Sequence, residues 1–93
     1  MILDTNLYVA HKVMKSTIER KLSQLNPLHI EVVDFSDGCG LKFDVKVVSQ
    51  EFEGKSLVQR HRIVHKQLEE EMKSIHALTL KTLTPSQWSA NST

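Results

Sequence analysis

The chain has 93 residues, of which 40% are hydrophobic, and this length and composition suit one small domain with a compact core. Twelve basic and eleven acidic residues leave a formal net charge of +1, which argues against strong nonspecific binding to nucleic acids. The single cysteine excludes an intrachain disulfide, and no apolar run approaches the roughly 20 residues needed to cross a bilayer.

A helix is predicted first, with apolar residues spaced four, four and three apart along one face: Met14, Ile18, Leu22 and Leu25. Its start has two interpretations. Residues 16–19 match a capping box, in which Ser16 and Glu19 satisfy free backbone N–H groups. Alternatively, Leu7 and Ala10 extend the apolar stripe backwards, and the helix then begins near Asp4. The Asn-Pro pair at residues 26–27 ends it, because a residue before proline avoids the helical region.

Two strands follow, joined by a turn. Residues 29–35 are rich in β-branched side chains, and the Asp-Gly-Cys-Gly sequence at residues 37–40 is typical of a turn. From Leu41 to Val47, apolar and charged residues alternate strictly, which predicts a strand with one buried face and one wet face.

A second turn at residues 53–55 leads into a long helical segment whose predicted buried stripe consists of Leu57, Val64, Leu68, Met72 and Ile75. This segment is expected to end at residues 74–75, and residues 76–83 form the third strand. The Thr-Pro-Ser-Gln sequence at residues 84–87 suits a final helical turn. In that turn the threonine is the N-cap and the proline takes the first helical position. The glutamine side chain reaches back to the backbone N–H of the threonine.

The order α-β-β-α-β predicts an α+β fold with a three-stranded mixed sheet. A short loop makes the first two strands antiparallel, and the helical crossover lets the third run parallel to the second. Both helices carry one apolar face, so they should cover the same face of the sheet. With the second strand in the centre, the N-terminal ends of the second and third strands lie side by side. This topology brings Cys39 close to His76.

A thiolate and an imidazole suit soft or borderline metals, including zinc and iron–sulfur clusters. Other interpretations are that Cys39 is a small loop residue and that His76 only complements a helix dipole. Two ligands fall short of the four that such a centre needs. If the pair binds a cluster, another molecule must supply the remaining ligands.

A group of cations lies on and before the long helix: Lys55, Arg60, Arg62 and Lys66. They could contact phosphates or an acidic partner, or form a solvated helix face. Trp88 could anchor a partner or close the edge of the core. The sequence lacks a Gly-x-Ser-x-Gly elbow and a phosphate loop, and it shows no paired carboxylates in an evident cleft, so we expect no enzymatic activity.

The N-terminal residues contain no basic region before their apolar residues and no arginine, unlike a secretory signal or a mitochondrial transit peptide. With a single cysteine in addition, we expect the cytoplasm or the nucleus, and no membrane association.

Residues 52–64 resemble the BolA family, whose pattern is an aromatic-acidic-Gly-Lys turn followed by Arg-His-Arg and an aliphatic residue. The resemblance continues through residues 68–72, 75–78 and 81–88, so that it spans roughly residues 16–88. It divides the chain into an N-terminal extension, residues 1–15, and a BolA-like domain, residues 16–93. We expect residues 1–13 to be dispensable for folding.

The resemblance implies a KH-like fold of the second type and an adaptor that joins a monothiol glutaredoxin around a shared [2Fe-2S] cluster. In such complexes the glutaredoxin gives one cysteine and glutathione gives a second thiolate. The BolA-like partner gives the histidine that here is His76, and a loop residue that here is Cys39. The isolated chain is then expected to hold no cluster. The alternative that the family suggests is a nucleic-acid-binding regulator, which the absence of a Gly-x-x-Gly loop weakens.

Overall fold

The computed structural model describes residues 2–38 and 40–91, with side chains for residues 10–38 and 40–90. The helices and strands, in chain order, are α1 (Ile2–Leu22), β1 (Pro27–Asp34), β2 (Leu41–Ser49), α2 (Leu57–Gln67), β3 (Ile75–Leu83) and α3 (Pro85–Asn91). Short 3-10 turns follow α1, β2 and α2. The predicted α-β-β-α-β order and the final helical turn are confirmed. No helix in the described residues is long and apolar enough to span a membrane.

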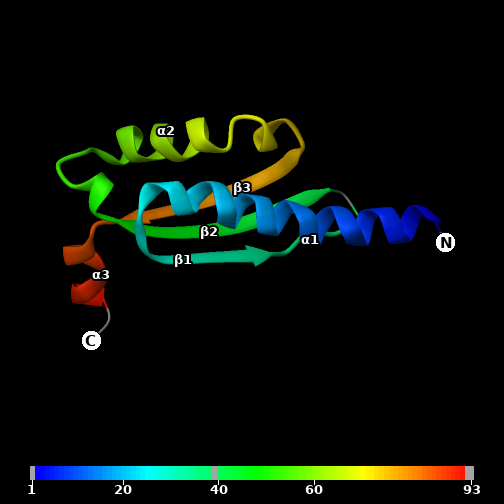
Figure 1. Cartoon of the computed structure of the whole chain (residues 1–93), viewed down its shortest axis with the longest axis horizontal. Helices are drawn as coiled ribbons and strands as arrows, with labels where there is room; N and C mark the ends of the chain where they lie inside the picture. The colour runs from blue at the N-terminus through cyan, green and yellow to red at the C-terminus, as the bar shows by residue number, and fades with distance from the viewer. Residues whose placement is uncertain (1, 39, 92–93) are drawn as a thin grey trace.

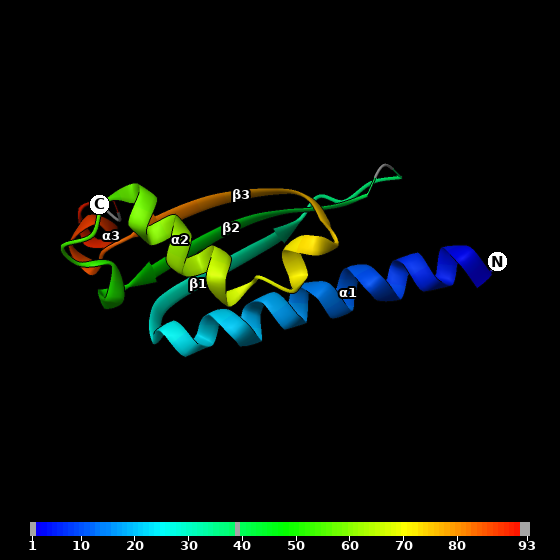
Figure 2. The ribbon, with the colours of Figure 1, turned by 90° about the horizontal axis from the view of Figure 1, so that it is seen from above.

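The sheet has the order β1-β2-β3, with β2 in the centre (Figure 1). β1 is antiparallel to β2, and β3 is parallel to β2, as the sequence predicted. The polypeptide reaches β3 through α2, which runs back along the sheet from the C-terminal end of β2 (Figure 2). The N-terminal ends of β2 and β3 therefore lie at the same end of the molecule.

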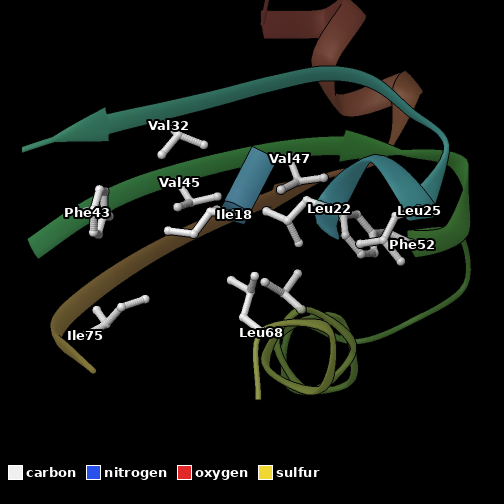
Figure 3. Close-up of a cluster of buried hydrophobic side chains, with 11 residues drawn as sticks. Ile18, Leu22, Leu25, Val32, Phe43, Val45, Val47, Phe52, Leu68 and Ile75 are labelled. Atoms are coloured by element: carbon white, nitrogen blue, oxygen red, sulfur yellow. The ribbon is translucent and has the colours of Figure 1, made fainter. Parts of the chain in front are cut away.

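The hydrophobic core lies between one face of the sheet and the two longer helices (Figure 3). β2 contributes Phe43, Val45 and Val47, because alternate residues of a strand point to the same face. α1 contributes Ile18 and Leu22, and the segment at the end of α2 adds further buried aliphatic residues, Val64 and Leu68. Both helices thus cover the same face, which confirms the expected layer arrangement.

α3 closes one end of the opposite face of the sheet. Its N-terminus forms the predicted cap, in which Gln87 N donates to Thr84 Oγ1 at 3.2 Å and Thr84 N donates to Gln87 Oε1 at 2.9 Å. The ring of Trp88 stacks on His29, with 4.6 Å between ring centroids and an angle of 17° between the planes. Trp88 therefore packs against His29 and Lys46 and lies outside the core cluster.

The capping box expected at residues 16–19 is wrong, because α1 continues unbroken from Ile2 through Ser16 to Leu22. The alternative start near Asp4 is closer to the structure. A Ser-x-x-Glu sequence caps a helix only where the chain enters the helix. Here the preceding residues are already helical and Met14 packs against the core.

The predicted stripe of the second helix needs correction at both ends. α2 stops at Gln67, Met72 lies in a 3-10 turn, and Ile75 is the first residue of β3. Leu57, expected in the core, is 61% exposed. Apolar spacing alone cannot distinguish a continuous helix from a helix that breaks and turns back toward the sheet.

The N-terminal part of α1 extends beyond the sheet (Figure 2), where Ala10 is exposed and Val13 is 58% exposed. A protein starting at Met14 loses the 3.6 Å contact between His11 and Asp34, both partly exposed, and should be destabilised by no more than about 1 kcal/mol. Removing Met14 as well should cost about 1 kcal/mol more, because this side chain packs on the core. Urea unfolding of both proteins checks this. A loss above about 3 kcal/mol on removing residues 1–13 would show that these thirteen residues are part of the folded core.

Candidate metal-ligand site

His76 lies at the N-terminal end of β3, where the sheet is irregular. Leu41 pairs with Ile75 and Lys42 pairs with Ala77, so that His76 is an extra residue between two paired ones. Such a bulge turns a side chain away from its regular direction. Ile75 is buried in the core, whereas His76 is exposed. The bulge therefore presents an imidazole to solvent from a firmly anchored strand.

The loop between β1 and β2 ends directly against this histidine. A Cβ atom built on Gly40 would lie 3.0 Å from His76 Cβ and 3.3 Å from His76 Cγ. Gly40 also has a φ of 141°, a conformation that other residues rarely adopt. Cys39 itself lies outside the described residues. The structure thus brings His76 to the residue that follows Cys39 in the chain.

Hydrogen bonds fix the base of this loop. Ser36 N donates to Asp34 Oδ1 at 2.9 Å, and Lys42 N donates to Ser36 Oγ at 2.8 Å. Asp37 and Gly40 form an isolated bridge, in which each backbone N–H donates to the other carbonyl at 3.2 and 3.1 Å. This bridge holds the two ends of the loop in register.

The charge on Asp34 is stabilised at this base. Partial burial raises the pKa of the Asp34 carboxyl. The hydrogen bonds from Ser36 and the charges of His11 and Lys15 lower that pKa by more than burial raises it. The net result is a pKa below the ordinary value. Asp34 therefore stays an acceptor for the Ser36 N–H over the whole physiological pH range.

The ring of His76 is accessible among the described residues. Among residues 2–38 and 40–91, no group of three or more His, Cys, Asp or Glu side chains is arranged to hold a metal ion. In the same part of the chain, no hydrogen bond or ion pair occupies the His76 ring. An exposed imidazole can act as a ligand for zinc or for an iron–sulfur cluster.

The predicted cationic group needs one correction. Arg60 is only 8% exposed: its Nε donates to Lys55 O at 2.9 Å, and one terminal nitrogen donates to Thr82 O at 3.3 Å and to Gln87 Oε1 at 2.9 Å. It ties α2 to β3 and α3 and cannot belong to a binding surface. Lys55, Arg62 and Lys66 are exposed. No local pattern distinguishes Arg60 from the other three residues, since all four side chains are cationic.

Substituting Gly40 tests the close approach to His76. Gly40→Ala should destabilise the fold by about 1–3 kcal/mol and shift the NMR signals of the His76 ring, because the new methyl group would overlap that side chain and strain the backbone. Gly38→Ala is the matched control, since a Cβ there meets no atom within 4 Å. Equal and small effects of the two substitutions would show that the loop does not depend on this contact.

The fold and the site together define a class of small α+β proteins in which two helices cover a three-stranded mixed sheet. In this chain an exposed histidine, His76, is the second residue of the third strand. The chain belongs to the BolA-like protein family, whose model matches residues 22–87.

Similar proteins agree with this assignment. The chain is 56% identical over 78 residues to Protein BOLA2 of Arabidopsis thaliana, covering 82% of this chain and 84% of that protein. It is 51% identical over 73 residues to BolA-like protein 2 of Mus musculus, covering 76% of this chain and 85% of that protein. The crystal structure of a Bol-like protein from Babesia bovis superposes with a TM-score of 0.80 at 44% sequence identity. The match covers 85% of this chain and 93% of that protein. Family membership and the fold thus rest on sequence and structure alike.

Proposed function

We propose that this protein is an adaptor that binds a monothiol glutaredoxin and shares a [2Fe-2S] cluster with it, in iron–sulfur trafficking or iron-status signalling. In this proposal His76 and Cys39 supply ligands from this chain, while the glutaredoxin cysteine and glutathione supply the others. The observation that carries the proposal is the exposed His76 ring on its bulge against Gly40, next in sequence to Cys39.

The incomplete donor set favours an adaptor over a protein with its own cluster. A [2Fe-2S] cluster needs four ligands, and the proposed site offers one imidazole, of His76, and one thiolate, of the single cysteine. An imidazole in place of a thiolate also raises the reduction potential of such a cluster. Formation of the heterocomplex would therefore change both the ligands of the cluster and its reduction potential.

Co-expression with a monothiol glutaredoxin tests the proposal. The purified heterocomplex should carry one [2Fe-2S] cluster with visible absorption and circular dichroism that differ from those of the glutaredoxin alone. Anaerobic reconstitution of this chain without the partner should give no stable coloured species, because half of the ligands are missing. A stable cluster with stoichiometric iron and sulfide on the isolated chain, or a heterocomplex with an unchanged glutaredoxin spectrum, would contradict the proposal.

A further inference from the structure

Two neighbouring aliphatic side chains are exposed in the first turn of α2. Leu57 is 61% exposed and Val58 is 59% exposed, although the core takes up Val64 from the same helix. The capping box of Ser56 and Gln59 fixes the backbone here, with hydrogen bonds of 2.9 and 3.2 Å. A rigid, adjacent pair of exposed aliphatic residues is a typical contact point for another molecule.

Positive charge continues from this pair along the helix. Arg62 and Lys66 follow Val58 at intervals of four residues, which places the three side chains on one side of α2. Both cations are exposed, and α2 contains no acidic residue. Within the described part of the chain, neither cation takes part in an ion pair. We define the α2 surface as Leu57, Val58, Arg62 and Lys66.

This surface begins at the end of the molecule opposite to His76. α2 starts after the C-terminal end of β2 and runs back toward the N-terminal end of β3, as Figure 1 shows. β2 has nine residues, and a strand of that length spans about 30 Å. A molecule bound to Leu57 and Val58 would therefore leave the His76 end accessible.

We propose that the α2 surface docks an acidic amphipathic segment of a second protein, in which aliphatic side chains alternate with carboxylates at helical spacing. Such a segment matches both parts of the surface, since its aliphatic residues cover Leu57 and Val58 while its carboxylates pair with Arg62 and Lys66. Nucleic acid matches less well, because phosphates gain nothing from the aliphatic pair and Arg60 points inward. This surface goes beyond cluster sharing and does not depend on it.

A labelled synthetic peptide tests this surface. The probe is a helix-forming peptide with Leu and Glu four residues apart, and its control carries Lys in place of Glu. Fluorescence anisotropy should show binding of the acidic peptide, and binding should weaken at higher salt. The double variants Leu57→Ser with Val58→Ser and Arg62→Glu with Lys66→Glu should each weaken this binding about tenfold or more.

Matched substitutions elsewhere serve as controls. Val13→Ser removes an equally exposed aliphatic residue from α1, and Lys81→Glu reverses an exposed charge on β3. Neither should change peptide binding, and His76→Ala should also leave it unchanged. Three results would overturn the proposal: no binding of the acidic peptide, equal binding of both peptides, or equal weakening by the controls. Tighter binding of a random DNA duplex, lost with the charge variant but kept by the serine variant, would assign the surface to nucleic acid instead.

Discussion

Replacing His76 with alanine is expected to abolish the visible circular dichroism spectrum that distinguishes the glutaredoxin heterocomplex. The ring is held by a strand whose neighbouring residue, Ile75, is buried in the core, so it loses little conformational entropy when it becomes a ligand. Its loss removes the only nitrogen ligand of the proposed cluster. The spectrum should then resemble that of the glutaredoxin alone.

Cys39→Ala should have a smaller effect. Cys39 stands between two glycines in the sequence, and a ligand on such a segment costs more entropy to fix. We expect this variant to keep the heterocomplex spectrum but to release its cluster faster. Both variants must bind the cluster-free glutaredoxin, and circular dichroism in the far ultraviolet must show that both are folded. Wild-type spectrum and cluster lifetime in His76→Ala would show that this histidine is no ligand.

Arg60→Met should destabilise the fold by about 2–4 kcal/mol. The guanidinium donates to two backbone carbonyls, of Lys55 and Thr82, and to the side chain of Gln87. Hydrogen bonds from a charged group are stronger than neutral ones, and their removal takes a donor away from the carbonyl of the buried Thr82. Because Gln87 also caps α3, the substitution should loosen the contact between α3 and the sheet.

Urea unfolding of the variant measures this loss. Arg62→Met is the matched control, because Arg62 is exposed on the same helix and its substitution should change stability by less than about 0.5 kcal/mol. The fluorescence of Trp88, the only tryptophan, should report the loosening of α3 in Arg60→Met alone. Equal stabilities of the two variants would mean that the Arg60 hydrogen bonds contribute nothing net to folding.

The sequence by itself determined the features that depend on neighbouring residues. The alternation from Leu41 to Val47 fixes which face of β2 is buried, and the hairpin and crossover lengths fix the direction of each strand. The cap of α3 was also predictable, because it is formed by two residues that are only three positions apart, Thr84 and Gln87. Even the approach of His76 to the β1–β2 loop was predictable, because parallel neighbouring strands begin at the same end of a sheet.

Only the tertiary structure decided features that depend on contacts between distant segments. Arg60 is buried while Arg62 is exposed, because only the former lies over Thr82 and Gln87. His29 and Trp88 are 59 positions apart in the chain, and no local pattern links them. The bulge at His76 likewise arises from pairing with β2, which tertiary packing imposes. The local sequence determines whether a segment forms a helix or a strand. The packing of one element on another decides which polar side chains are buried and which remain exposed for binding.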